Sequence, residues 1–116
     1  MAPKDIEALL DELEAKDWLS DRRFAESYVA DKRGRFGRGR LAQELRRRGV
    51  AADIVDEVLA ACGANEVVRL REVWARKFGA APKDARAYAK QTRFLLARGF
   101  AAELVARLLK GGLDED

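Results

Sequence analysis

The sequence repeats itself after fifty residues. The stretch 45–55 aligns with 95–105, and each copy has an arginine-glycine pair followed by one hydrophobic residue and two alanines. The same shift places Phe24 on Trp74 and Tyr28 on Phe78. A repeat of this length is typical of chains in which small structural units stack side by side. We therefore expect an array with an extended surface, suited to a long partner, rather than one closed catalytic domain.

Hydrophobic spacing predicts an all-α fold. Apolar residues recur at helical intervals, and no segment has the strict alternation of a strand. Gly49 and Gly99 are expected to stop helices in the left-handed conformation. Ser20 and Asn65 are expected helix caps, and Pro82 should lie near a helix start. The pattern predicts about seven helices, over residues 4–16, 20–32, 40–48, 54–62, 65–78, 82–98 and 101–110.

These helices are expected to form tandem three-helix repeats in an extended, curved array of right or left hand. Asp5, Ile6 and Leu10 match Asp53, Ile54 and Val58 at a shift of 48 residues. The first helix therefore resembles the last helix of an earlier copy. We predict four segments: the last helix of a truncated first repeat (1–17), a second repeat (18–63), a third repeat (64–112) and an acidic tail (113–116).

Composition argues against an enzyme. The chain has no histidine, which removes the commonest general base and a common zinc ligand. It has no phosphate-binding loop, and the glycines at 34, 37 and 39 follow no strand, so they are not a dinucleotide fingerprint. We expect no catalytic residue, no cofactor and no metal. The single Cys62 suits a reducing cytoplasm, and no apolar run approaches the roughly 18–20 residues of a membrane span.

Positive charge recurs with the repeat. Residues 21–50 carry ten bases against four acids, and residues 66–100 carry nine against three, so each block has a charge of +6. Residues 1–20 are acidic instead, with six acids against two bases. Basic blocks of this kind can attract nucleic acid or an acidic protein surface over about 8–10 Å at physiological salt.

Two stretches of the chain resemble the RecX family of recombination regulators. The first is Trp18-Leu-Ser-Asp-Arg-Arg-Phe-Ala25, followed by Gly37, Arg40-Leu41, Glu44-Leu45 and Gly49-Val50. The second is Gln91-Thr-Arg-Phe-Leu-Leu-Ala-Arg-Gly-Phe100. The sequence departs from the family pattern at Ser20, where an acid is usual, and at Ala97, where a second arginine is usual.

The resemblance implies a cytoplasmic, non-enzymatic, monomeric modulator of the RecA recombinase, with no membrane contact. RecX proteins lie in the groove of the RecA–DNA filament and suppress its ATPase and strand exchange, which limits homologous recombination and DNA repair. Members of the family usually have three three-helix repeats, so the resemblance also implies that the first repeat is shortened here.

Two basic clusters are the candidate binding residues. Arginine suits both carboxylate and phosphate, because its planar fork donates paired hydrogen bonds. We expect the clusters to contact acidic RecA surface, DNA phosphate or both, with the glycines of the loop allowing close approach of a partner. The first cluster is Lys32, Arg33, Arg35, Arg38, Arg40, Arg46, Arg47 and Arg48, and the second is Arg86, Lys90, Arg93 and Arg98.

Most aromatic side chains are assigned to the core instead. Trp18, Phe24, Trp74, Phe78, Phe94 and Phe100 lie on apolar stripes or at repeat-equivalent positions. Phe36 lies between glycines in a basic loop and is expected to be exposed.

Two alternatives remain open at this stage. The chain could be a DNA-binding module that acts without RecA, although only Gln43, Asn65 and Gln91 offer amides for reading base edges. Weak, non-specific phosphate binding is the easier form of that hypothesis. The chain could also be a helical scaffold for another acidic protein.

Overall fold

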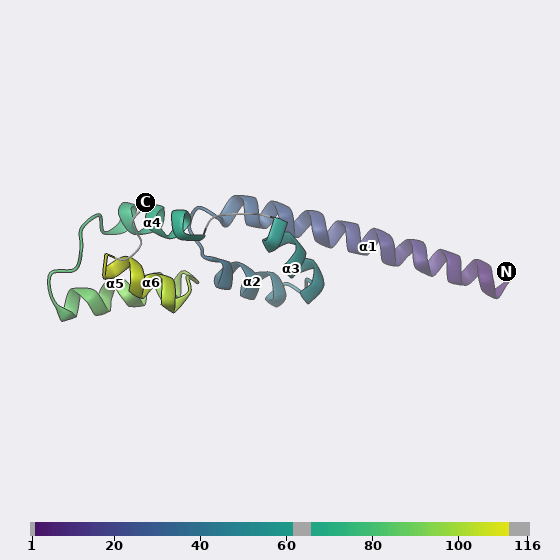
Figure 1. Ribbon diagram of the computed structural model, residues 1–116. Helices are drawn as coiled ribbons and strands as arrows, with labels where there is room; N and C mark the ends of the chain where they lie inside the picture. The colour runs from purple at the N-terminus through teal and green to yellow at the C-terminus, as the bar shows by residue number, and fades with distance from the viewer. Residues whose placement is uncertain (1, 62–65, 112–116) are drawn as a thin grey trace.

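The computed structural model describes residues 2–61 and 66–111. In these ranges the chain forms six helices and no strand, within an extended body of 72 × 28 × 20 Å (Figure 1). The all-α, extended architecture predicted from the sequence is confirmed. The helices are α1 (Pro3–Lys32), α2 (Arg38–Arg47), α3 (Ala52–Ala61), α4 (Glu66–Lys77), α5 (Ala85–Ala97) and α6 (Ala102–Leu109).

The two helices predicted before the glycine loop are one continuous helix. The 30 residues of α1 run through Ser20, so the predicted helix start there is wrong. The reason is local: no glycine or proline interrupts the chain between Pro3 and Gly34, and a serine alone does not end a helix. The first half of α1 projects from the body (Figure 1), and its apolar stripe of Ile6, Leu9, Leu10 and Leu13 is 45–53% exposed.

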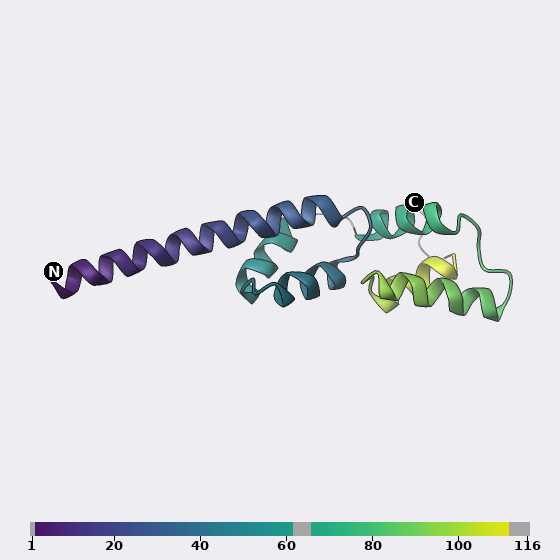
Figure 2. The ribbon, with the colours of Figure 1, turned by 180° about the vertical axis from the view of Figure 1, so that it is seen from behind.

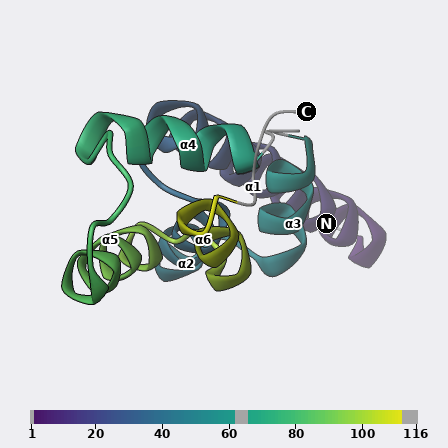
Figure 3. The ribbon, with the colours of Figure 1, turned by 60° about the vertical axis from the view of Figure 1, so that its left-hand side comes forward.

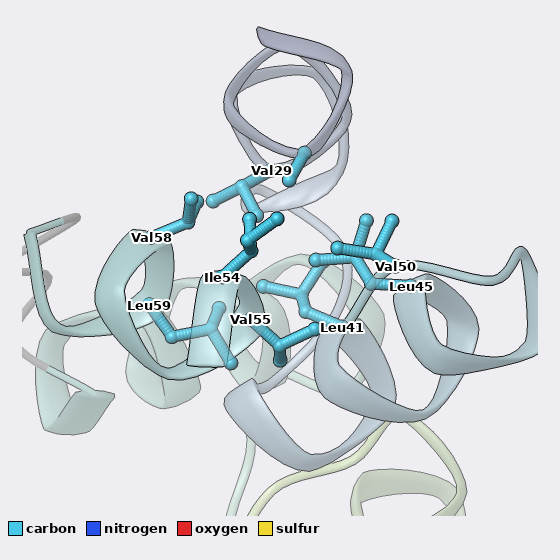
Figure 4. Close-up of a cluster of buried hydrophobic side chains, with 9 residues drawn as sticks. Val29, Leu41, Leu45, Val50, Ile54, Val55, Val58 and Leu59 are labelled. Carbon is cyan, nitrogen blue, oxygen red and sulfur yellow. The ribbon is translucent and has the colours of Figure 1, made fainter. Parts of the chain in front are cut away.

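Two hydrophobic cores lie one after the other along the molecule. The first joins α1, α2 and α3 around Leu41, Leu45 and Ile54 (Figure 4). The second joins α4, α5 and α6 around Leu70 and Leu95. Residues related by the fifty-residue shift are buried alike, and the pairs are Leu45 with Leu95, Val50 with Phe100, and Val55 with Val105. The internal repeat is therefore a repeat of packing.

Glycines end the helices as the sequence predicted. Gly49 and Gly99 have φ of 88° and 93°, a left-handed conformation that strains any residue with a Cβ atom. At the start of α5, the Asp84 carboxylate accepts a hydrogen bond from the Ala87 N–H at 2.8 Å. This cap places the helix start at Ala85, later than predicted. The predictions for Cys62, Gly63, Asn65, Gly112 and the tail 113–116 lie outside the described residues.

The helices line the two long sides of the body. The second half of α1 and α4 follow one another on one side, and α5 and α2 follow one another on the other (Figures 1 and 2). Viewed more nearly along the body, α4 lies across from α5 and α6 (Figure 3). The two helices that carry most of the candidate arginines therefore lie on the same side.

Candidate partner-binding surface

The carboxyl end of α5 is hydrogen-bonded to the amino end of α2. The N–H of Gly37 donates to the Arg98 carbonyl at 2.7 Å, and the N–H of Gly39 donates to the Gly99 carbonyl at 3.0 Å. Arg40 Nη1 donates to the Ala97 carbonyl at 3.1 Å. Helix ends carry backbone groups without partners inside the helix, and here each end satisfies the other. The helix dipoles are also aligned head to tail, which is the favourable arrangement.

This junction requires glycine on both sides. A Cβ at Gly37 would lie 2.6 Å from the Gly99 carbonyl oxygen, and a Cβ at Gly99 would overlap the backbone nitrogen and Cβ of Arg40. The sequence suggested that the glycine loop allows a partner to approach. In the structure, Gly37 and Gly39 approach Gly99 of the same chain instead.

Helix α4 holds the same loop from the other side. The Arg69 side chain is 7% exposed, and its Nε donates to the Arg33 carbonyl at 3.0 Å. It also donates to the Phe36 carbonyl and forms an ion pair with Glu66 at 3.0 Å. The other Glu66 oxygen accepts the Arg38 N–H at 2.8 Å. One buried arginine thus ties the loop to the second core.

Sequence reasoning did not single out Arg69. The sequence feature that could have indicated its role is its position. Arg69 lies three residues after Glu66 and four before Val73, so the three share one helix face. By type alone, an arginine is usually exposed. Arg76, which donates to the Gly34 carbonyl, was missed for the same reason.

We expect Arg69→Met to lower the free energy of unfolding by about 2–3 kcal/mol, because two loop carbonyls lose their donor and Glu66 loses its partner. Arg69→Lys should be nearly as unstable as Arg69→Met, since an ammonium group cannot reproduce the hydrogen bonds of the forked guanidinium. Urea unfolding followed by circular dichroism measures both. Arg23→Met, at an exposed position on α1, is the matched control and should change stability by less than about 0.5 kcal/mol. Equal stability of the Arg69 and Arg23 variants would contradict the role given to Arg69.

The first cluster is exposed at both ends of α2, but several of its members are engaged within the chain. Lys32 pairs with Asp31, and Arg40 and Arg47 share Glu44 at 3.4 and 3.2 Å. The Arg48 guanidinium lies 5.1 Å from the centre of the Tyr28 ring. Lys32 and Arg40 are half-buried. The other members are exposed to solvent, Arg47 and Arg48 in spite of these contacts: Arg33, Arg35, Arg38, Arg46, Arg47 and Arg48.

The second cluster divides into an exposed part and a junction part. Arg86, Lys90 and Arg93 are exposed along α5. Arg98 is half-buried, and its guanidinium lies 4.9 Å from the centre of the Phe94 ring and 5.8 Å from that of Phe36.

The junction brings the two clusters together at Phe36. Arg40 and Arg35 lie 4.5 and 5.8 Å from the centre of the same ring, so arginines of both clusters surround it. Phe36 was expected to be exposed, yet it is half-buried against the first core. The reason is the junction itself, which the sequence did not reveal.

Two aromatic assignments are corrected. Trp18 and Phe24 are 38% and 41% exposed and belong to neither hydrophobic core, although the Arg48 guanidinium lies 6.0 Å from the centre of the Phe24 ring. Phe100 is 3% exposed, as predicted, and Trp74, Phe78 and Phe94 are half-buried against the second core or one another.

One residue considered for base reading is occupied internally. Gln91 is 6% exposed, accepts a hydrogen bond from Trp74 Nε1 at 2.9 Å and donates to the Ala80 carbonyl at 3.0 Å. Its amide therefore cannot meet a base edge.

Two similarly packed three-helix cores joined by a hydrogen-bonded junction define a tandem helical-repeat protein. Two family models match the chain: the second three-helix domain of RecX over residues 20–59, and the third over residues 65–109. The chain belongs to the RecX family.

Curated relatives support the assignment over most of the chain. A regulatory protein RecX of Chromobacterium violaceum is 46% identical over 112 residues, which cover 97% of this chain and 72% of the relative. Those of Herminiimonas arsenicoxydans and Pseudomonas fluorescens Pf-5 are 47% and 43% identical, with 91% and 97% of this chain and 70% and 75% of the relatives covered. No solved structure gives a significant match.

Neither a membrane span nor a metal site is found in the described ranges. Among residues 2–61 and 66–111, no helix is long and apolar enough to cross a bilayer. The same residues contain no group of three histidine, cysteine or acidic side chains placed to bind a metal ion.

Proposed function

We propose that this protein is a negative regulator of RecA-mediated homologous recombination and DNA repair. It binds as a monomer in the groove of the RecA–DNA filament in the cytoplasm, and it suppresses the filament's ATPase and strand exchange. Membership in the RecX family and the name of its relatives, regulatory protein, support a regulatory role. We propose that it acts by binding alone, without catalysis or cofactor.

The end-to-end arrangement of α5 and α2 carries the proposal. These helices have 13 and 10 residues, so together they extend about 35 Å at 1.5 Å per residue. Exposed bases lie along this length, from Arg86 on α5 to Arg46 on α2. A repeat array offers an extended surface of this kind. A surface of this length suits contact with more than one protomer of a helical filament.

We further propose that residues 18–63 and 64–112 are the two binding units, and that 1–17 belong to an earlier repeat. Each proposed unit contains one hydrophobic core and one basic helix. Two binding units on one chain gain from multivalency, because binding of the first raises the effective concentration of the second.

The DNA-dependent ATPase of RecA tests the function. The purified protein should hydrolyse no ATP, and it should lower the RecA ATPase at protein-to-RecA ratios well below one. Strand exchange measured in the same mixtures should fall with it. An undiminished ATPase at a saturating ratio would reject the proposal.

Direct DNA binding is the second candidate, and the exposed arginines favour a phosphate-binding form of it. Since Gln91 is buried, sequence-specific reading is disfavoured. Titration against unrelated DNA sequences separates the candidates: tight binding with a large sequence preference and no effect on RecA would favour the DNA-binding module.

A further inference from the structure

A pocket of about 290 Å³ opens beside the junction of the two cores. Its wall comes from the glycine loop, from α4 and from the carboxyl end of α5. Four of its six lining residues are cations, two are apolar, and none is acidic. The residues are Arg35, Val73, Arg76, Lys77, Phe94 and Arg98.

Part of the pocket wall is held in place by packing and hydrogen bonding. Val73 is 6% exposed, and Phe94 packs edge-on against Phe78, with ring centres 5.4 Å apart at 87°. Arg76 is held by its hydrogen bond to the Gly34 carbonyl. Three of the six lining side chains are therefore held by packing or by a hydrogen bond, which lowers the cost of ordering them around a ligand.

Two of the cations lie against the aromatic ring and have no carboxylate partner among residues 2–61 and 66–111. Lys77 Nζ lies 5.2 Å, and Arg98 Cζ 4.9 Å, from the centre of the Phe94 ring. Such contacts orient a cation but satisfy few of its N–H groups. Neither Lys77 nor Arg98 pairs with a carboxylate among the described residues. Four positive groups around one cavity create a strong local attraction for an anion.

We propose that this pocket binds the carboxylate of an acidic side chain on a protein partner. The concave shape admits a protruding side chain, the apolar floor of Val73 and Phe94 suits its methylene groups, and the cations surround its charged end. A nucleic acid fits less well. Phe94 is half-buried and already contacts two cations and a second ring, so it offers no open face on which a base could stack. The inference deepens the proposed function, because it assigns the chemistry of one contact with the partner.

Peptide binding without RecA tests the pocket directly. A fluorescein-labelled hexaglutamate peptide should bind the protein, as measured by fluorescence anisotropy at fixed low salt. The double variant Arg35→Gln with Lys77→Gln should weaken binding at least tenfold, because both residues line the pocket and neither donates a hydrogen bond that holds the junction. Circular dichroism should show unchanged helix content.

The matched control is Arg107→Gln with Lys83→Gln, which removes one arginine and one lysine at exposed positions outside the pocket. It should change the affinity by less than twofold. Equal losses in the two double variants, or no binding to the wild-type protein, would overturn the proposal. Displacement of the peptide by inorganic phosphate or a short oligonucleotide at lower concentrations than by free hexaglutamate would also overturn it, in favour of a phosphate site.

These outcomes are independent of the RecA ATPase. If the protein binds the peptide but does not inhibit RecA, the pocket proposal is supported and the proposed function is rejected. If the protein inhibits RecA but does not bind the peptide, the proposed function is supported and the pocket proposal is rejected.

Discussion

Gly99→Ala is expected to lower the free energy of unfolding by about 3–5 kcal/mol and to open the junction between α5 and α2, while the contacts of α4 with the glycine loop remain. An alanine at φ of 93° costs about 1–2 kcal/mol. Its Cβ would also overlap the backbone of Arg40, which cannot move aside as a flexible side chain can. The three hydrogen bonds between α5 and α2 would then be lost, at about 1 kcal/mol each.

The repeat supplies the control for this variant. Gly49 occupies the equivalent position in the first copy and has nearly the same φ, 88°, but a Cβ there would meet nothing within 4 Å. Gly49→Ala should therefore cost only the backbone strain of about 1–2 kcal/mol. Urea unfolding measures both costs, and small-angle scattering should show a larger radius of gyration for Gly99→Ala alone. Equal destabilisation by the two variants would mean that the junction contributes nothing.

Reversal of Arg46, Arg47 and Arg48 to glutamate is expected to raise the concentration needed for half-inhibition of the RecA ATPase at least tenfold. The change shifts the net charge by six units at the most basic segment of the chain. Charged groups across an interface govern encounter as well as affinity, so the loss should be steepest at low salt.

Two further variants locate the effect. Lys4, Lys16 and Lys83 changed together to glutamate give the same shift in net charge at exposed positions away from α2, and inhibition should then change by less than threefold. Arg48 contacts Tyr28, so the triple variant also needs an unchanged circular-dichroism signal. Arg46→Glu alone avoids that packing contact and should reproduce part of the loss. If both triple variants lose inhibition equally, only net charge matters and α2 is not a specific contact.

The sequence predicted what the two copies share. Leu45 and Leu95 are buried and Gly49 and Gly99 are left-handed, because the local pattern that determines them is present in both copies. It did not predict how the copies meet. The junction joins Gly37 to Gly99, two positions that are not equivalent in the repeat, so no periodicity indicates their contact.

The difference between local sequence pattern and tertiary contact also explains why the structure differs from expectation at Ser20, Arg69 and Gln91. Ser20 has the right chemistry for a cap, but nothing in the preceding residues ends the helix, and α1 continues. Arg69 and Gln91 look like surface residues by type, yet tertiary contacts supply partners for their polar groups and they are buried. Whether the candidate arginines contact RecA remains a prediction, since it depends on a second molecule.

Because of the junction, the strength of each proposed contact can change without a change in the distance between the two contacts. Five of the six groups in the junction's three hydrogen bonds belong to the main chain, so the distance between the arginines of α5 and those of α2 depends little on which side chains those helices expose, Arg40 excepted. Substitutions on the surface can then strengthen or weaken each contact while the span between them stays constant. Under the proposed function, such substitutions would change the affinity for a helical partner but not the pitch that the protein matches.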